Sequence, residues 1–339
     1  MGNFRSMQPA PKGLGAPKPQ SGFGIGNSLA GQLLMTNRTL SYLKSAIGNR
    51  QSAMLLAALW LLLPLAQSAE LSLPFELKQT GTFDPRMEAV QGLAFDSHDL
   101  LYVAGAPGVK VFDPGGKLVR ALETSAPVCS VAVDQDGFVY AAQRARVEKF
   151  DPQGKLVCAW GKEGKGPGQF QFIASVAVSG PTVYVADGGA RRLNRFAADG
   201  DFIDDVSGFL IPSGHFDTAV DSKGVLYVAH SGKHRIERYD ANLQLAGFWG
   251  EFGMEPQEFC GCCNPTNIAL FADGRVATTE KGIPRLKVYD PQGKLLAHLG
   301  SEAFAPDAEG MDLAIDSKQR IALADPISRR IRFYTSRHK

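Results

Sequence analysis

Hydrophobic and polar residues alternate in short runs along the chain, and this pattern recurs six times between residues 75 and 335. Each copy resembles "GLAFDSHDLLYVAG", in which two β-rich runs flank a polar turn. An alanine stands at the same point of every first run, at spacings of 38 to 50 residues: Ala94, Ala132, Ala177, Ala219, Ala269 and Ala314. Alternation with a period of two on both sides of a turn predicts a β-hairpin.

A second hairpin follows the first in most copies, as in "VEKFDPQGKLVCAWG". Its Asp-Pro-x-Gly-Lys motif favours a tight turn, because proline fixes φ and glycine adopts the left-handed conformation. Four short strands per repeat at this period are typical of the blades of a β-propeller. The sequence therefore predicts an all-β, six-bladed β-propeller.

The sixth repeat stops after its third strand, at "RIRFYTSRHK". The segment "FELKQTG" (Phe75 to Gly81) has the length and terminal glycine of the fourth strands elsewhere. We expect this N-terminal strand to pair with the strand that contains Ile331 and Phe333, which would close the ring and remove two open sheet edges.

Several segments resemble the NHL-repeat family: "WGKEGKGPGQF", "VAVDQDGFVYAA", "YVADGGARRLNRF" and "HRIERYDANLQL". The resemblance covers about residues 75 to 335 and implies the six-bladed fold. Six-bladed relatives include a peptide-amidating lyase, lactonase-like hydrolases and many exported proteins. The resemblance therefore implies a fold, and the activity has to be argued from the site.

The N-terminal part of the chain has the composition of a targeting region. Residues 1–52 are predicted to be a disordered, basic region, within which Met35 is a second candidate start. Residues 53–69 are predicted to be a signal peptide: the apolar run Ala53 to Ala66 has 14 residues and precedes "AQSAE". A membrane-spanning helix needs about 20 apolar residues, so we expect cleavage rather than a stable transmembrane anchor. Residues 70–339 would then form the propeller, exported to the periplasm or the extracellular space.

The charge balance argues against some classes of partner. The net charge is +2 over 339 residues, so we expect no nucleic-acid partner. One arginine recurs on the third strand of five repeats, which favours a scaffold role over a polyanion site: Arg146, Arg192, Arg235, Arg285 and Arg330. We expect a monomer.

Three of the five cysteines, Cys260, Cys262 and Cys263, lie within "EFCGCCNPTN". In a propeller, the links between blades and the links between second and third strands share one face, here called the top face. The loop that ends at Phe170 reaches the inner strand in five residues, whereas the loop that ends at Phe259 takes eight. The cysteine loop therefore carries a three-residue insertion on the top face, where repeat proteins often bind ligands.

The clustered thiols allow three chemistries. Exported proteins form disulfides, which could join Cys260 to Cys263, Cys262 to Cys263, or Cys129 to a loop cysteine. Alternatively, Cys260, Cys262 and Cys263 could bind a soft metal such as copper or zinc, or an iron–sulfur cluster. A third possibility is a reactive thiol with a nearby histidine as base.

Other top-face residues are candidate ligand-binding groups. They precede an inner strand, end a second strand or shape the cysteine loop: Cys129, His215, His230, Glu280 and Asn264. Asp217, Asn267 and Asp312 begin three inner strands and could form an oxygen-rich Ca²⁺ site, although hydrogen bonding to channel water is the favoured interpretation. The partner is expected to be a protein or a small molecule on the top face.

These observations predict an exported NHL-type propeller that acts as a binding module through a cysteine-rich top face. The alternative is a metal- or thiol-dependent enzyme of the lyase, hydrolase or redox type that uses the same face.

Export generates a direct test. N-terminal sequencing of the mature protein is expected to begin within a few residues of Glu70, because the small residues of "AQSAE" suit signal peptidase. Recovery of a soluble protein that still begins at Met1 or Met35 would contradict cleavage.

Overall fold

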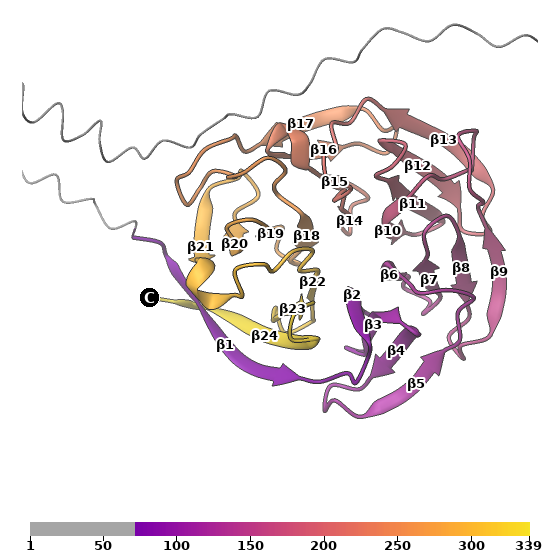
Figure 1. Cartoon of the computed structure of the whole chain (residues 1–339), viewed down its shortest axis with the longest axis horizontal. Helices are drawn as coiled ribbons and strands as arrows, with labels where there is room; N and C mark the ends of the chain where they lie inside the picture. Colours follow the sequence, from indigo (N-terminus) through magenta and orange to yellow (C-terminus); the bar gives the residue numbers. More distant parts are fainter. Residues whose placement is uncertain (1–71) are drawn as a thin grey trace, which may run out of the picture. The chain divides into compact units, whose positions relative to one another are not determined.

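The computed structural model describes residues 72–339, so the predicted N-terminal region and signal peptide lie outside the described residues. Within this range, six four-stranded antiparallel sheets surround a central axis (Figure 1). The predicted all-β, six-bladed β-propeller is confirmed. No helix in residues 72–339 is long and apolar enough to cross a membrane.

The blades follow one another around the ring in chain order. Blade 1 contains β2 (Ala89–Phe95), β3 (Leu101–Ala106), β4 (Gly108–Phe112) and β5 (Leu118–Leu122). Blade 2 contains β6 (Ser130–Val133), β7 (Val139–Ala142), β8 (Val147–Phe150) and β9 (Leu156–Trp160). Blade 3 contains β10 (Ile173–Ser179), β11 (Thr182–Asp187), β12 (Arg192–Ala197) and β13 (Phe202–Ser207).

Blade 4 contains β14 (Thr218–Val220), β15 (Leu226–His230), β16 (Arg235–Tyr239) and β17 (Leu245–Trp249). Blade 5 contains β18 (Asn267–Leu270), β19 (Val276–Glu280), β20 (Arg285–Tyr289) and β21 (Leu295–Leu299). Blade 6 contains β22 (Leu313–Ile315), β23 (Ile321–Asp325), β24 (Arg330–His338) and, from the other end of the propeller, β1 (Phe75–Phe83). Two short 3₁₀ helices, Ser231–Lys233 and Ser301–Ala303, lie in links between strands.

The N-terminal strand closes the ring as the sequence predicts. Strand β1 pairs with β24 along its whole length, with Gly81 opposite Phe333 and Phe83 opposite Ile331. Leu77 of β1 is buried in a cluster that also contains residues of blades 5 and 6. The chain therefore closes by joining segments from its two ends, and this leaves β24 without an open edge.

The hairpin turns have a common chemical basis. Asp113 Oδ1 accepts the backbone N–H groups of Gly115 and Lys117, each at 2.9 Å. Such aspartates satisfy the turn backbone locally. The same double contact recurs in seven other hairpins, at Asp96, Asp134, Asp151, Asp221, Asp240, Asp290 and Asp316.

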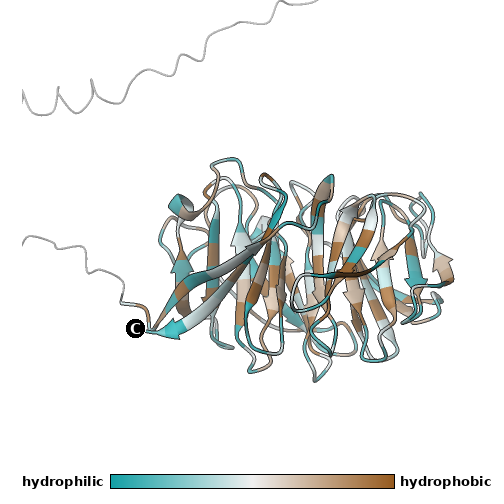
Figure 2. Ribbon diagram, turned by 90° about the horizontal axis from the view of Figure 1, so that it is seen from below, coloured by the Kyte–Doolittle hydropathy of each residue, from teal (hydrophilic) through white to brown (hydrophobic). Residues whose placement is uncertain are grey.

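Hydrophobic residues gather within the strands, which run across the thickness of the ring (Figure 2). They form clusters shared between neighbouring blades, because each sheet packs one face against the preceding blade and the other face against the following blade. The repeated alanine of the inner strand faces the following blade: Ala94 packs in a cluster with Val131 of blade 2. A small side chain is favoured there because the inner strands converge towards the axis.

Ring closure by β1 can be tested with two adjacent substitutions. Leu77→Ala is expected to lower the free energy of unfolding by about 2 to 4 kcal/mol, because Leu77 is only 5% exposed. Lys78→Ala is the matched control: Lys78 is exposed on the same strand, so a change within about 0.5 kcal/mol is expected. Urea unfolding measures both values. Equal effects of the two substitutions would show that packing of β1 does not stabilise the closed ring.

Candidate functional site

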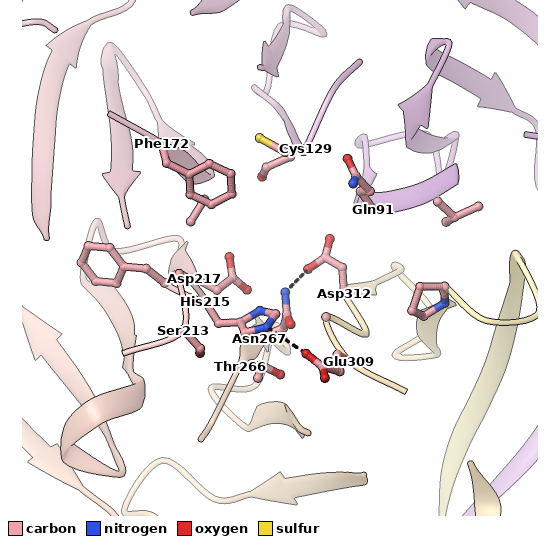
Figure 3. Close-up of a pocket in the computed structure, with 17 residues that line it drawn as sticks. Gln91, Cys129, Phe172, Ser213, His215, Asp217, Thr266, Asn267, Glu309 and Asp312 are labelled. Carbon is pink, nitrogen blue, oxygen red and sulfur yellow. Dashed lines mark hydrogen bonds and ion pairs between the residues drawn. The ribbon is translucent and has the colours of Figure 1, made fainter. Parts of the chain in front are cut away.

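A cavity of about 290 Å³ opens at the top end of the central channel. Its walls come from the loops that lead into the inner strands, and Figure 3 shows polar side chains from several blades pointing into it. The lining combines acids, amides, a histidine, a thiol and an aromatic ring: Gln91, Cys129, Phe172, His215, Asp217, Asn267, Glu309 and Asp312. Below it, the channel widens again into a space of about 240 Å³, and Ser130, Asp217 and Asp312 border both spaces.

The floor of the cavity is built from one repeated position at the top of the inner strands. Each residue there contacts the following blade. Asp217 accepts the N–H of Ile268 at 2.8 Å, and Asp312 accepts the N–H of Leu93 at 2.7 Å. Ser130 accepts the N–H of Val176 at 3.1 Å. These side chains therefore join neighbouring blades through main-chain hydrogen bonds.

The remaining members of this ring follow the same rule. Ser175 donates to the carbonyl of Phe216 at 3.0 Å, and Asn267 Nδ2 donates to Asp312 Oδ1 at 3.1 Å. At Gly92, an added Cβ would lie 3.0 Å from the Ser130 Cα atom, so any side chain there would have to displace the backbone of blade 2 slightly. Asn267 Oδ1 is buried and has no hydrogen-bond partner among the described residues. The floor thus combines two carboxylates with an unused amide oxygen.

Burial changes the acidity of both carboxylates. It raises the pKa of Asp217 to about 6, against the opposing effect of its hydrogen bonds. Burial, together with the negative charge of Asp217, raises the pKa of Asp312 well above its usual value. Two neighbouring carboxylates in one site resist simultaneous ionisation. The pair therefore retains a proton more readily than isolated aspartates do, and a bound cation would favour its loss.

Above the floor, His215 faces Glu309 across the cavity mouth (Figure 3). The His215 Nε2 atom lies 3.9 Å from Glu309 Oε2, and the Lys281 ammonium lies 3.7 Å from the same oxygen. Burial and the positive charge of Lys281 lower the pKa of His215. The neutral imidazole can therefore accept a proton from a ligand at neutral pH.

Cys129 lines the opposite side of the cavity and remains a thiol. Its Sγ lies 3.2 Å from the carbonyl oxygen of Ala142 and 3.3 Å from that of Ile173, so the S–H donates to main chain. Burial raises its pKa to about 12. The thiolate that a metal or a nucleophilic reaction needs is thus disfavoured at this position.

His230 and Glu280, predicted as ligand-binding residues, instead hold the loops that lead into their blades. His230 Nε2 accepts the N–H of Leu210 at 2.8 Å, while Nδ1 lies 2.9 Å from a Glu237 carboxylate oxygen. Both ring nitrogens are therefore engaged, and the side chain is 1% exposed. It does not line the top-face cavity.

Glu280 occupies the corresponding place in blade 5. Its Oε2 accepts the N–H of Cys260 at 3.1 Å, and its Oε1 lies 2.5 Å from the fully buried Lys287 ammonium. Asp187 has the same role in blade 3, where it accepts the N–H groups of Gln171 and Phe172. The structure thus places the polar atoms of His230 and Glu280 against the protein itself, outside the lining of the top-face cavity.

Asn264 closes the cysteine loop rather than facing a ligand. Its amide nitrogen donates to the carbonyls of Cys260 and Lys281, and its oxygen accepts the Lys281 N–H at 2.9 Å. Gly261 adopts φ of +77°, a left-handed conformation that lets the loop turn between Cys260 and Cys262. The parallel bridges of Phe170 and Phe259 confirm that the two loops are equivalent up to these phenylalanines.

The loop sulfurs do not converge on one point. All five cysteines of the chain are free, so the predicted Cys129–loop disulfide is not formed in this structure. Cys260 is buried with its Sγ 3.5 Å from Glu280 Oε2, and burial raises its pKa. The Sγ atoms of Cys262 and Cys263 are 2.9 Å apart. Among residues 72–339, no three His, Cys, Asp or Glu side chains are placed to hold a metal ion.

Several cavity residues are absent from the candidates predicted from sequence, among them Phe172 and Glu309. Phe172 and Glu309 lie in the loops before β10 and β22, which are not part of the strand repeat. Their position just before an inner strand is the signal that could have identified them, since His215 precedes its own inner strand in the same way.

No protein-family model and no curated protein matches the chain. Similar solved structures include a streptogramin B lyase, with a TM-score of 0.55 and 12% sequence identity, covering 78% of this chain and 98% of that chain. A chain of a mitotic checkpoint complex has a TM-score of 0.54 and 11% identity, covering 76% of this chain and 91% of that chain. At this level of identity, the similarity shows the propeller fold alone.

The acidic floor predicts a specific pH dependence of stability. Because the pKa of Asp217 is raised in the folded state from 3.8 to about 6, the folded state binds more protons than the unfolded state between these values. The protonated Asp217 therefore contributes about 3 kcal/mol to the free energy of unfolding. This contribution is fully present below pH 3.8 and is lost as the pH rises through about 6.

Asp217→Asn should flatten this part of the pH profile, because it also removes the charge that raises the pKa of Asp312. It should cost about 1 to 3 kcal/mol near pH 4, since an amide oxygen replaces only one of two accepting oxygens. Urea unfolding between pH 4 and pH 7 measures both effects. The exposed Asp307→Asn is the matched control and should leave the profile unchanged. Parallel profiles for wild type and Asp217→Asn would contradict the assignment.

Proposed function

We propose that the protein is an exported, NHL-type propeller that binds a small cationic ligand in the top-face cavity. The observation that carries this proposal is the floor of that cavity, where Asp217 and Asp312 lie beside the unpartnered oxygen of Asn267. Burial raises the pKa of both carboxylates, and the charge of Asp217 raises that of Asp312 further, so a bound cation would stabilise their ionised forms. At the mouth, Glu309 is paired with Lys281, while burial and the charge of Lys281 lower the pKa of His215 and so favour its neutral form.

The rest of the top face supports a binding role. Several large hydrophobic side chains are exposed on its loops and are available to contact a ligand: Phe172, Leu210, Phe252, Met254 and Ile327. Phe172 also lines the cavity, so a ligand could place an apolar part against its ring while a positive group reaches the carboxylates. The cysteine loop lies on this same face, and we include it in the proposed binding surface.

Export and family assignment rest on the sequence. The apolar run before "AQSAE" supports secretion to the periplasm or extracellular space, and the blade sequences support the NHL relationship. A monomeric module that captures a small molecule outside the cytoplasm agrees with both. A nucleic-acid partner is disfavoured by the net charge of +2.

Binding can be tested with benzylammonium as a probe and benzyl alcohol as its neutral counterpart of similar shape. Calorimetry or ligand-observed NMR is expected to show binding of the ammonium compound only. Its affinity should rise as the pH increases through about 6, because the carboxylates must be charged.

Asp312→Asn should lower the affinity for benzylammonium by about tenfold or more, because one buried charge contact is lost. Glu76→Gln, an exposed acid-to-amide change on the outer strand β1, is the matched control and should have no effect. Equal binding of both probes, or binding insensitive to Asp312→Asn, would show that the acidic floor does not select cations.

A catalytic role is the second candidate, favoured by His215. A neutral imidazole beside a carboxylate at the mouth of a cavity is suited to general base catalysis, as a lyase would require. The similarity to a streptogramin B lyase structure is compatible with this role but is limited to the fold. In that case, His215→Ala would abolish turnover of a bound substrate while retaining its binding.

A further inference from the structure

The three-residue insertion on the top face carries two adjacent thiols with very different environments. Cys262 is exposed, whereas Cys263 is only 1% exposed. Their Sγ atoms are 2.9 Å apart, in an S–H···S contact. Cys260 does not belong to this pair, because it is buried against Glu280. Cys262 and Cys263 are therefore called the dithiol.

The surroundings of the two thiols separate their acidities, and Cys263 is the more acidic of the pair. Burial alone would raise the pKa of the Cys263 thiol, but the hydrogen bond from Cys262, with Ser213 and the Lys281 ammonium, lowers it. The same hydrogen bond, together with the charge of Cys263, raises the pKa of Cys262. Cys263, near a lysine, therefore loses its proton more readily than the exposed Cys262.

We propose that the dithiol is a thiol–disulfide exchange site that reacts with small-molecule disulfides and closes to a disulfide between Cys262 and Cys263. In the first step, Cys263 takes the proton of Cys262, and the Cys262 sulfur attacks one sulfur of the disulfide. The disulfide bond breaks, and a first thiolate leaves. In the second step, Cys263 gives its proton to that thiolate and attacks Cys262 Sγ. The mixed disulfide breaks, and a second thiolate leaves. Two electrons pass from the two cysteines to the reagent.

Geometry makes this disulfide a reversible one. Adjacent Cα atoms are about 3.8 Å apart, below the usual lower bound of about 4.4 Å for disulfides, so the ring is strained. Strained and exposed disulfides are readily reduced, which suits a switch better than a staple. The loop does not need the bond for its shape, because Asn264 already holds it to the main chain of Cys260 and Lys281.

The dithiol is linked to the cavity through shared neighbours. The charge of Lys281 lowers the pKa of Cys263, and the same ammonium lies 3.7 Å from Glu309. Ser213 also lowers the pKa of Cys263 and lines the cavity. Oxidation removes the ionisable Cys263 thiol, so the charge of Lys281 then acts on Glu309 and the cavity mouth without a thiolate to offset it. This coupling rests on the proposed function: oxidation should weaken the binding of a cationic ligand severalfold.

The reaction is tested by treating native protein with oxidised glutathione and mapping its peptides by mass spectrometry. The expected product has lost two hydrogen atoms within the peptide that contains both cysteines, and dithiothreitol restores them. Cys263→Ser should instead retain one glutathione on Cys262, because the resolving sulfur is missing. Cys262→Ser should remain unmodified at the buried Cys263. Glutathione retained on Cys262 of wild type, or no reaction there, would overturn the proposal.

Coupling to the cavity is tested separately with benzylammonium. Its affinity should fall severalfold when wild type is oxidised, and it should not respond to the oxidant in the double variant Cys262→Ser, Cys263→Ser. Cys158→Ser is the matched single-thiol control on an outer strand and should behave like wild type. An unchanged affinity of oxidised wild type would overturn the coupling. If benzylammonium fails to bind at all, the cationic-ligand proposal fails, while peptide mapping still decides the exchange reaction.

Discussion

The close approach of six inner strands at the axis is the constraint on which the rest of the structure depends. At the top of each inner strand, one residue contacts the next blade, and this residue is a glycine in blade 1 and a short polar residue in the other five blades. Gly92 leaves the space free, because a Cβ would lie 3.0 Å from Ser130 Cα. The other five positions carry short polar side chains, and each forms a hydrogen bond to the next blade. A ring built in this way has polar groups at its centre as a consequence of closure.

Closure alone does not require the polar groups to be acids. Ser130 and Ser175 join blades without a charge, whereas Asp217 and Asp312 do so with carboxylates whose burial costs free energy. Two buried acids within mutual influence are therefore more than the scaffold needs. Residues that reduce stability where a neutral residue would suffice are found mainly at functional sites. The two acidic members of the ring therefore differ in role from the two serines, although all four occupy one repeat position.

The fold could be predicted from the sequence because the same pattern of strands and turns recurs in all six repeats. The alanine of each inner strand, the Asp-based turns and the matching length of "FELKQTG" all specify one blade pattern. The candidate site was less predictable because different residue types at one repeat position can accept the same kind of hydrogen bond. Asp187, His230 and Glu280 all accept N–H groups of the loop that leads into their blade. His230 departs from the repeat in sequence, yet its Nε2 accepts the N–H of Leu210 just as the acidic residues of the other two blades accept N–H groups of their loops.

Phe172 and Glu309 lie in loops of irregular length outside the strand repeat, so the repeat pattern alone does not identify them as site residues. The cysteine insertion was visible for the opposite reason, because it interrupts a loop whose counterpart ends at Phe170. Its sulfurs could not be assigned from spacing, since a bend at Gly261 turns Cys260 towards Glu280 and leaves Cys262 beside Cys263. Lys281 then connects this pair to Glu309 at the cavity mouth. Because one ammonium serves both groups, a change in the charge of the sulfurs must change the field in the cavity, whatever ligand the cavity holds.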